Sequence, residues 1–409
     1  MIRSTSGGRN VDRRRFFETA GIAALGAGLS RCSTRTAPAP ANATRPPVPL
    51  TPADVSWERV IRTTVGLRPH RDRGFVLRAE KLDRKTVIHN FGHGGAGISL
   101  GWGTGQMASE MALSHLDREA AVLGCGAVGL SCARELQRHG FAVTIYSMAV
   151  PPDTTSNMAF AGFTPTAWLV DNKSITPEWE EQFRRAVTIA YRRLQLMVGR
   201  RYGISWVSTY TPTNDVHAAA GEIAVLPKEV QTGLTLLQPG EHPFPTTYAV
   251  QGLMMRIEPS IYLEALLSDF QSSGGRIVIR KLDTRNDLMW LPESLIVNCT
   301  GLGSKELFGD EGLVPMKGQL TVVVPQPEVD YSTNGGVSAP SPVPGNGLHM
   351  MPRSDGIVLG GIAQRGVWSL DVDEAERKRI VEGHMELFHS MRAPGSRVSD
   401  SGRGVSAFL

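Results

Sequence analysis

Apolar residues in this 409-residue chain recur with two periods, one typical of strands and the other typical of helices. Short apolar runs predict buried strands at residues 60–67, 86–90, 120–123, 141–146, 276–280, 294–298, 318–324 and 356–360. Longer amphipathic stretches with capping residues predict helices at residues 98–116, 130–139, 177–199, 261–273 and 374–389. The strand–helix–strand succession over residues 120–146 predicts a right-handed βαβ unit and an α/β fold class.

The first 32 residues are typical of a targeting segment rather than of a folded domain. Residues 12–17 (DRRRFF) resemble a twin-arginine export signal, and the apolar run at 19–30 is too short to span a bilayer comfortably. Small residues at 37–43 offer cleavage sites. We therefore expect export to the periplasm or the extracellular space without stable membrane insertion; the alternative is a basic disordered tail. Lipid attachment at Cys32 is not expected, because Arg31 occupies a position that requires a small residue.

The remaining composition is that of an ordinary globular protein, with 41% hydrophobic and 20% charged residues. Residues 33–56 are rich in Pro, Ala and Thr, which predicts a disordered linker. The net charge of +4 is small and arises partly from the N-terminal segment, so no nucleic-acid partner is expected. Four cysteines at irregular spacing predict neither a disulfide framework nor a zinc site, and we expect no metal.

A Gly-x-Gly-x-x-Gly motif follows the predicted strand at 120–123 and opens the next predicted helix. In such a motif the first glycine makes the tight turn, the second lets the backbone approach a pyrophosphate, and the third lets helix and strand pack closely. The helix N-terminus adds partial positive charge for the phosphates. The motif therefore predicts nucleotide binding; the alternative is a glycine-rich connection in another α/β fold. The predicted contacts are Gly124, Gly126, Ala127, Val128 and Gly129.

The strand after this helix ends at Ser147, where dinucleotide-binding proteins usually carry an acidic residue for the adenosine ribose. No arginine replaces the acid, so NADP is not favoured. Ser147 is a candidate hydrogen-bond donor to the ribose.

A second glycine-rich segment, residues 89–97 (HNFGHGGAG), comes before the first. With other short motifs it resembles the D-amino acid oxidase and D-aspartate oxidase family, and the set covers nearly all of residues 57–390. The other motifs are Val-Gly-Leu-Arg-Pro at 65–69, Thr-Thr-Ser at 154–156, Phe-Ala-Gly-Phe-Thr-Pro at 160–165, Val-Asn-Cys-Thr-Gly-Leu-Gly at 297–303, Lys-Gly-Gln at 317–319, Met-Met-Pro-Arg at 350–353, Leu-Gly-Gly at 359–361 and Trp368.

The order of these motifs differs from the order that the family shows. The segment at 89–97 normally lies near the C-terminus, and the dinucleotide turn normally opens the chain. We therefore predict a circular permutation in which residues 117–119 join the former ends. The new ends would lie between the helix at 374–389 and the strand at 60–67. The alternative is an independent glycine-rich loop before an ordinary Rossmann domain.

The resemblance implies FAD as cofactor and a single oxidase unit over residues 57–409. Its fold would be a Rossmann-like FAD-binding domain interleaved with an α+β substrate domain. The FAD-binding domain is expected mainly at residues 86–165, 257–310 and 371–392. The substrate domain is expected mainly at residues 57–80, 166–256 and 311–370.

The resemblance also implies a role for particular residues. Arg68 would clamp a substrate carboxylate through its paired planar donors, and the carbonyl of Gly95 would accept from the substrate amine. The substrate Cα–H would then face the flavin N5, so that hydride transfer needs positioning rather than a strong base. The helix beginning near residue 98 would direct its positive end at the flavin ring. Further FAD contacts by this match are Gly94, Gly95, Gly97, Ser99, Thr154, Thr155, Gly162 and Gly301.

This chain departs from the family at two tyrosines that lie near the substrate. One is His349 here and the other is Gly345, so the substrate side of the site has changed. We expect His349 to donate to the carboxylate or to titrate near neutral pH. Arg353, Gln364 and Arg365 are candidates either for supporting the residues that contact the substrate or for contacting its far end, whereas His89 and His93 are expected to support the glycine turn.

The function that follows is oxidative deamination of a D-amino acid or related amine. Dioxygen is expected to reoxidise the flavin and yield hydrogen peroxide, and the imine is expected to hydrolyse to an oxo acid and ammonia. Two alternatives stay open: a flavin amine dehydrogenase that uses another acceptor, and a flavin-fold binding protein that has lost turnover. Nothing in the sequence sets the oligomeric state.

Overall fold

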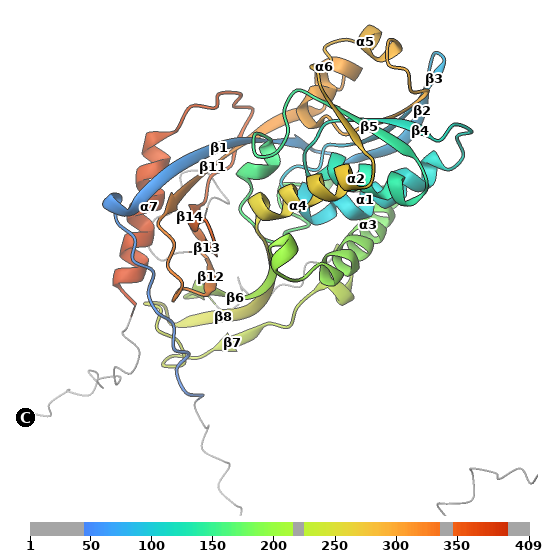
Figure 1. Cartoon of the computed structure of the whole chain (residues 1–409). Coiled ribbons are helices and arrows are strands. Elements are labelled where there is room, and N and C mark those ends of the chain that lie inside the picture. Colours follow the sequence, from blue (N-terminus) through green and yellow to red (C-terminus); the bar gives the residue numbers. More distant parts are fainter. Residues whose placement is uncertain (1–44, 216–224, 336–346, 392–409) are drawn as a thin grey trace, which may run out of the picture. The chain divides into compact units, whose positions relative to one another are not determined.

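The computed structural model describes residues 45–215, 225–335 and 347–391. These residues belong to one compact unit built on two β-sheets with packed helices (Figure 1). The predicted export signal, Cys32 and Gly345 lie outside the described residues. No helix among the residues described combines the length and the apolar character that crossing a membrane requires.

The first sheet has six strands in the order β2-β3-β10-β4-β5-β9, parallel except for β2. Both faces of its central strands are buried, which accounts for their short, continuously apolar sequences. The predicted βαβ unit is present as β4-α2-β5. The strands are β2 (Val76–Leu82), β3 (Lys85–Phe91), β10 (Leu295–Asn298), β4 (Glu119–Leu123), β5 (Ala142–Ser147) and β9 (Arg276–Ile279).

Helices cover both faces of this sheet. The largest apolar cluster joins one face to four helices, which are α1 (Gly97–Ala112), α2 (Ala127–Arg138), α3 (Pro177–Leu196) and α4 (Pro259–Ser272). A smaller cluster on the other face includes α5 (Arg285–Met289). The remaining short helices in the described part of the chain are α6 (Ser304–Phe308), η1 (Trp57–Arg59), η2 (Thr155–Met158), η3 (Asn172–Ser174), η4 (Arg200–Tyr202), η5 (Lys228–Val230) and η6 (Gly301–Gly303).

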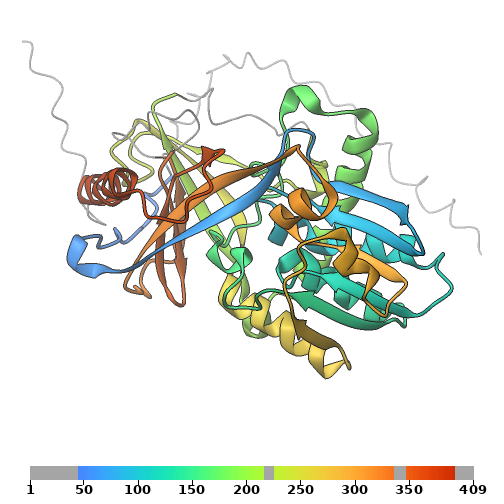
Figure 2. The same ribbon diagram turned by 90° about the horizontal axis from the view of Figure 1, so that it is seen from above.

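The second sheet has nine strands in the order β1-β11-β14-β13-β12-β6-β8-β7, and β15 pairs with β11. Helix α7 (Glu374–His389) packs against one of its faces (Figure 2). The strands are β1 (Val60–Arg71), β11 (Leu313–Val323), β14 (Gly356–Gly360), β13 (His349–Arg353), β12 (Tyr331–Asn334), β6 (Ile204–Thr213), β8 (Tyr248–Ile257), β7 (Thr235–Leu237) and β15 (Gln364–Arg365).

The prediction of a disordered linker is wrong for residues 45–56. Leu50, Ala53 and Val55 are buried in the cluster beneath α7, and Asp54 exchanges hydrogen bonds with Gln326. The proline-rich composition conceals apolar residues that dock against the nine-stranded sheet. The oxidase unit therefore begins before residue 57.

The predicted domain boundaries need three further corrections. Helix α7 lies within the range assigned to the FAD-binding domain, yet it packs on β11 and β14 of the other sheet. Helix α3, assigned to the substrate domain, packs on α1. Strand β2 begins inside the range 57–80, yet it pairs with β3 of the six-stranded sheet. The prediction assigned these elements to a domain by their position along the sequence. Where they pack is decided by the burial of their apolar faces.

Candidate active site

Both glycine-rich segments lie at the same edge of the six-stranded sheet. Gly124 follows β4, Gly94 and Gly95 follow β3, and β10 lies between these two strands. The carboxyl ends of adjacent parallel strands therefore present both loops on one side, where open α/β sheets bind their ligands. A methyl group added at Gly97 would lie 3.5 Å from Val128 Cγ2, so the two turns are in contact.

The turn before α2 has the geometry of a pyrophosphate cradle. Gly124 has φ +101°, and a Cβ there would lie 2.7 Å from the carbonyl oxygen of Cys299. A Cβ at Gly129 would lie 2.1 Å from the Gly124 oxygen, so both positions exclude a side chain. The N–H of Ala127, at the start of α2, donates to Ser156 Oγ at 3.0 Å. These residues fit a dinucleotide whose phosphates lie at the helix N-terminus.

The other predicted cofactor residues surround the same turn. Ser99, in the first turn of α1, accepts from the N–H of Thr164 at 2.9 Å. Thr155 lies in η2, which packs on β1, and Thr154 donates to Asn157 Oδ1 at 2.8 Å. Gly301 follows β10 in the left-handed region with φ +59°. Gly162 forms an isolated bridge with Arg256 in β8.

Ser147 is not a donor to the ribose as predicted. Its hydroxyl donates to the carbonyl oxygen of Ala149 at 2.6 Å, and a hydroxyl carries one hydrogen. With this bond in place, Ser147 can accept a hydrogen bond from a ribose hydroxyl, as the acidic residue usually found at this position does.

Arg68 belongs to β1 of the nine-stranded sheet and lies close to the Gly95 loop of the six-stranded sheet. Its guanidinium lies flat on Gly318 of β11, where an added Cβ would be 2.5 Å from the guanidinium carbon and both terminal nitrogens. One terminal nitrogen donates to the carbonyl of Ile362 at 3.4 Å. A Cβ at Gly95 would lie 3.3 Å from Arg68 Cδ, so the structure brings these two predicted residues together. Desolvation lowers the pKa of Arg68 to about 10, and the side chain therefore stays cationic at neutral pH.

His349, in β13, lies beside this arginine. Its ring rests on Gly360 of β14, and the edge of the ring contacts Phe160 with a centroid distance of 4.3 Å. Burial, reinforced by the neighbouring His384, Arg68 and Arg379, lowers the pKa of His349 to about 3. The expectation that His349 titrates near neutral pH is therefore wrong, whereas a neutral imidazole remains able to donate one hydrogen bond.

The structure pairs the candidate far-end contacts with other groups. Gln364 donates to Asp373 at 2.8 Å, and Arg365 forms a bidentate ion pair with Asp72 on the surface. Arg353 is paired with Asp355. These pairings do not favour Gln364 and Arg365 as direct contacts to the substrate, since these polar groups are engaged with Asp373 and Asp72.

The two histidines of the glycine segment support the turn as predicted. His93 bonds Thr104 at 3.0 Å and stacks on Phe75, and burial lowers the pKa of His93 to about 3. His89 bonds Asn298 at 3.1 Å and pairs with Glu80.

Four residues that matter were absent from the predicted site. Gly318 and Gly360 form the floor under Arg68 and His349, and Phe160 covers His349. Ser156 caps the α2 turn from a distant loop. All four lie inside motifs, at 317–319, 359–361, 160–165 and 154–156, so the motifs contain the signal that finds them. The pairing of Ser156 with Ala127 follows from the tertiary structure.

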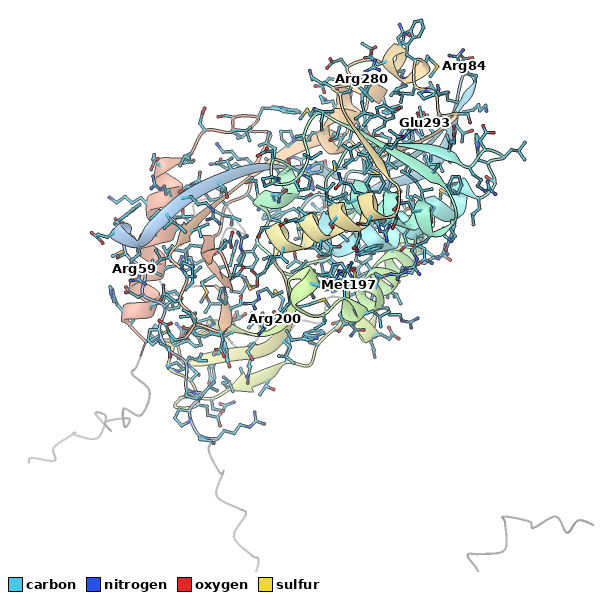
Figure 3. The ribbon with its side chains drawn as sticks, viewed as in Figure 1. Arg59, Arg84, Met197, Arg200, Arg280 and Glu293 are labelled. Atoms are coloured by element: carbon cyan, nitrogen blue, oxygen red, sulfur yellow. The ribbon has the colours of Figure 1, made fainter. Side chains whose placement is uncertain are left out.

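A cavity of about 340 Å³ lies at the edge of the six-stranded sheet opposite the glycine-rich loops. It is lined by Arg84, Lys85 and Trp290, and Figure 3 shows Arg84 and Glu293 at that end of the molecule. Lys85 begins β3, whereas the glycine turns follow the ends of the strands. This cavity is therefore remote from the site. The described residues hold no cluster of three or more His, Cys, Asp or Glu side chains that could bind a metal ion.

Comparison with known proteins decides the family. The family described as FAD dependent oxidoreductase (DAO) matches residues 47–111 and 119–407. The chain belongs to this family. Its predicted fold class, its cofactor FAD and its class as an FAD-dependent oxidoreductase are thereby confirmed.

Individual relatives agree with this assignment. The chain is 29% identical over 268 residues to D-aspartate oxidase of Homo sapiens, covering 64% of this chain and 73% of that protein. It is 27% identical over 296 residues to D-amino-acid oxidase of Rubrobacter xylanophilus, covering 70% and 81%. Among solved structures, glycine oxidase from Geobacillus kaustophilus shares the fold with a TM-score of 0.50 at 15% identity, covering 68% and 81%.

Proposed function

We propose that this enzyme oxidatively deaminates a D-amino acid or a related amine that carries a carboxylate. The observation that carries the proposal is the guanidinium of Arg68, held flat on Gly318 beside the Gly95 loop. Two of the curated relatives are a D-aspartate oxidase and a D-amino-acid oxidase, which supports an amino acid as substrate. The turn before α2 and the loop after β3 would hold FAD, which would supply the hydride acceptor, and dioxygen would be the oxidant that restores it and gives hydrogen peroxide.

The chain's own residues orient the substrate. Arg68 donates two hydrogen bonds to the carboxylate, and the Gly95 carbonyl accepts one from the amine. His349 donates from its neutral ring. Because the pKa values of His349 and His93 are about 3, neither ring is an effective base at neutral pH. Catalysis by this chain therefore rests on positioning, which can contribute a large part of the rate acceleration.

An anaerobic experiment tests the proposal. Purified yellow protein is mixed with D- and L-amino acids without oxygen, and loss of flavin absorbance is followed. We expect bleaching by at least one amino acid, followed by stoichiometric peroxide when air is admitted. Bleaching without peroxide favours a dehydrogenase with another acceptor, and binding without bleaching favours a protein without turnover.

An Arg68→Leu variant tests the assigned clamp. Loss of a buried charge-assisted pair is expected to lower kcat/KM by about 100-fold or more for carboxylate substrates. Full activity of this variant on such a substrate would refute the role of Arg68. FAD content, measured by absorbance, serves as the control for folding.

We further propose that the chain is a circular permutation of the family's order. Two observations support this. The family match is divided into 47–111 and 119–407, and the break falls between α1 and β4. The first and last described segments also meet, because Tyr331 donates to the Thr51 carbonyl at 2.9 Å and its hydroxyl lies 3.8 Å from Met391 Sδ. Ends that lie close together make such a rearrangement inexpensive.

We also propose that the twin-arginine motif exports the folded enzyme. The test is fractionation of cells that express the full chain and a variant with Arg13→Lys and Arg14→Lys. Activity and FAD are expected outside the cytoplasm for the natural chain and inside it for the variant. Identical distribution of the two proteins would contradict export by this signal.

A further inference from the structure

One face of the nine-stranded sheet carries Arg68 and His349, the two side chains assigned to the substrate carboxylate. In the register of β1 and β11, Gly66 is opposite Gly318 and Thr64 is opposite Leu320. Because side chains on a strand alternate between faces, Arg68 shares this face with both pairs. The face continues across β14 and β13, where His349 is opposite Gly360 and Met351 is opposite Val358.

This face holds one guanidinium that no carboxylate neutralises. Within the described residues, Arg68 makes no ion pair, and its hydrogen bond goes to a backbone carbonyl. Other buried or partly buried arginines nearby are engaged; Arg62 pairs with Asp355 and Arg379 with Glu376. Arg353 donates to Asp355 and to the Ala159 carbonyl, and Arg256 donates to Ser205 and to the Pro352 carbonyl. The site therefore offers charge for one carboxylate.

Apolar side chains lie on this face next to Arg68 and His349. Phe160 contacts His349 and packs in two apolar clusters at once. One cluster contains Ala161, Val207 and Met351, and the other contains Leu320, Val322 and Val358. A ligand whose carboxylate lies on Arg68 therefore has the partly buried Phe160 nearby, and Phe160 itself packs on the buried Leu320 and Met351.

From these contacts we infer that the substrate is an amino acid with one carboxylate and an apolar side chain, and that Phe160 is a specificity-determining residue for this choice. The inference rests on the proposed function. An acidic side chain would bring a second carboxylate against apolar atoms without a cation to receive it, which is strongly unfavourable. An apolar side chain would lose only water contacts there.

A panel of amino acids tests the inference. Anaerobic reduction of the holoenzyme is measured with D-leucine, D-methionine, D-aspartate and D-glutamate, and with the L-enantiomers. We expect kcat/KM for leucine or methionine to exceed that for aspartate by about 100-fold or more. A preference for aspartate or glutamate would overturn the inference. If no amine bleaches the flavin, the proposed function fails instead.

Ligand binding gives a readout that does not depend on turnover. Hexanoate and succinate are titrated into the holoenzyme by calorimetry. Hexanoate is expected to bind at least about 10-fold more tightly, because it presents one carboxylate and an apolar chain. Tighter binding of succinate would overturn the inference even in the absence of any amine oxidation.

Variants of Phe160 assign the preference to that residue. Phe160→Arg adds a cation and is expected to raise the aspartate-to-leucine ratio of kcat/KM by about 10-fold or more. Phe160→Leu keeps the surface apolar and is expected to retain the natural preference. Phe163→Leu is the matched control, because Phe163 lies in the same loop but packs on Tyr191. Should all three variants show the natural ratio with full FAD content, Phe160 does not determine specificity.

A cavity of about 150 Å³ on the same face allows one further experiment. Leu320 and Val358 line it together with Arg62, whose side chain is 38% exposed and which pairs with Asp355. If glutamate reached this cavity, Arg62→Met would abolish its oxidation selectively. We expect no such selectivity, since Arg62 is engaged with Asp355.

Discussion

At the scale of single residues, the site depends on two glycines, Gly318 and Gly360, which have no side chain. Gly318 and Gly360 lack the Cβ that would collide with the guanidinium of Arg68 and the ring of His349. The guanidinium of Arg68 can therefore lie flat on Gly318, and the ring of His349 can pack directly on Gly360. The charges and the hydrogen-bond donors are visible in the sequence, whereas the flat floor appears only when β1, β11, β14 and β13 are aligned.

A Gly318→Ala variant tests this floor. Its Cβ would lie 2.5 Å from the Arg68 guanidinium, which must move away. Displacement of a positioning group by about 1 Å can cost about 100-fold, so we expect kcat/KM to fall by about that factor with FAD content unchanged. Steady-state kinetics check this. Gly233→Ala is the control, because no atom lies within 4 Å of the added Cβ; equal losses in both variants would contradict the role of the floor.

The buried histidines make stability depend on pH. The pKa values of His93 and His349 are about 3 and that of His384 is about 4, below the ordinary value of 6.5. Between these values the unfolded chain binds protons that the folded chain does not. The free energy of unfolding therefore falls as pH drops below 6.5, by up to about 1.4 kcal/mol per pH unit for each histidine.

Urea unfolding at pH 7.5 and pH 5.5 measures this effect. The free energy of unfolding of the natural chain should be lower at pH 5.5. The His384→Gln variant should show a smaller difference between the two pH values, because one of the three histidines no longer contributes. A variant with the same pH dependence as the natural chain would show that His384 does not contribute.

At the scale of elements, the turn before α2 and the segment at 45–56 show opposite outcomes of sequence reasoning. The turn follows directly from its glycine spacing, because close approach of backbone to backbone leaves no alternative residue. The segment at 45–56 has the composition of a linker but carries three apolar residues that dock under α7. Composition averages over residues, whereas docking depends on the few that are buried.

Leu50→Ala tests the docking of this segment. Leu50 is 6% exposed, so its truncation should cost about 2–3 kcal/mol of unfolding free energy. Chemical denaturation measures the cost. Thr51→Ala, at an exposed neighbouring side chain, should change stability by less than about 0.5 kcal/mol. An unchanged midpoint for Leu50→Ala would mean that the segment does not contribute to the core.

Gly129→Ala tests the α2 turn. The added Cβ would lie 2.1 Å from the Gly124 oxygen, so the helix must move away from the strand. We expect the variant to be purified without FAD, as measured by the ratio of flavin to protein absorbance. Retention of a full complement of FAD would contradict the role of this turn.

At the scale of the whole molecule, two distant parts of the chain build one site. The loops after β3 and β4 come from the six-stranded sheet, and Arg68 and His349 come from the nine-stranded sheet. The site does not depend on the order of these parts along the chain. It depends on β3, β10 and β4 being neighbours in the six-stranded sheet.

A rearranged chain tests the proposed permutation. It begins at residue 117, continues to 391, crosses a flexible Gly/Ser linker and ends with residues 45–112. We expect it to fold, bind FAD and keep the natural substrate preference. A chain opened within α2 is the control and should not bind FAD. Failure of both chains would contradict the proposal, provided that the natural chain is produced well under the same conditions.

The sequence by itself indicated the family and the cofactor, because glycine spacing and the Arg68 motif express local backbone and charge requirements. It also located most strands and helices, since their apolar periodicity is a local property. Only the tertiary structure decided that α7 belongs with the nine-stranded sheet, that Gln364 and Arg365 are engaged elsewhere, and that His349 is neutral. The physical reason is the same in each case: partners and burial are set by residues far away in the chain.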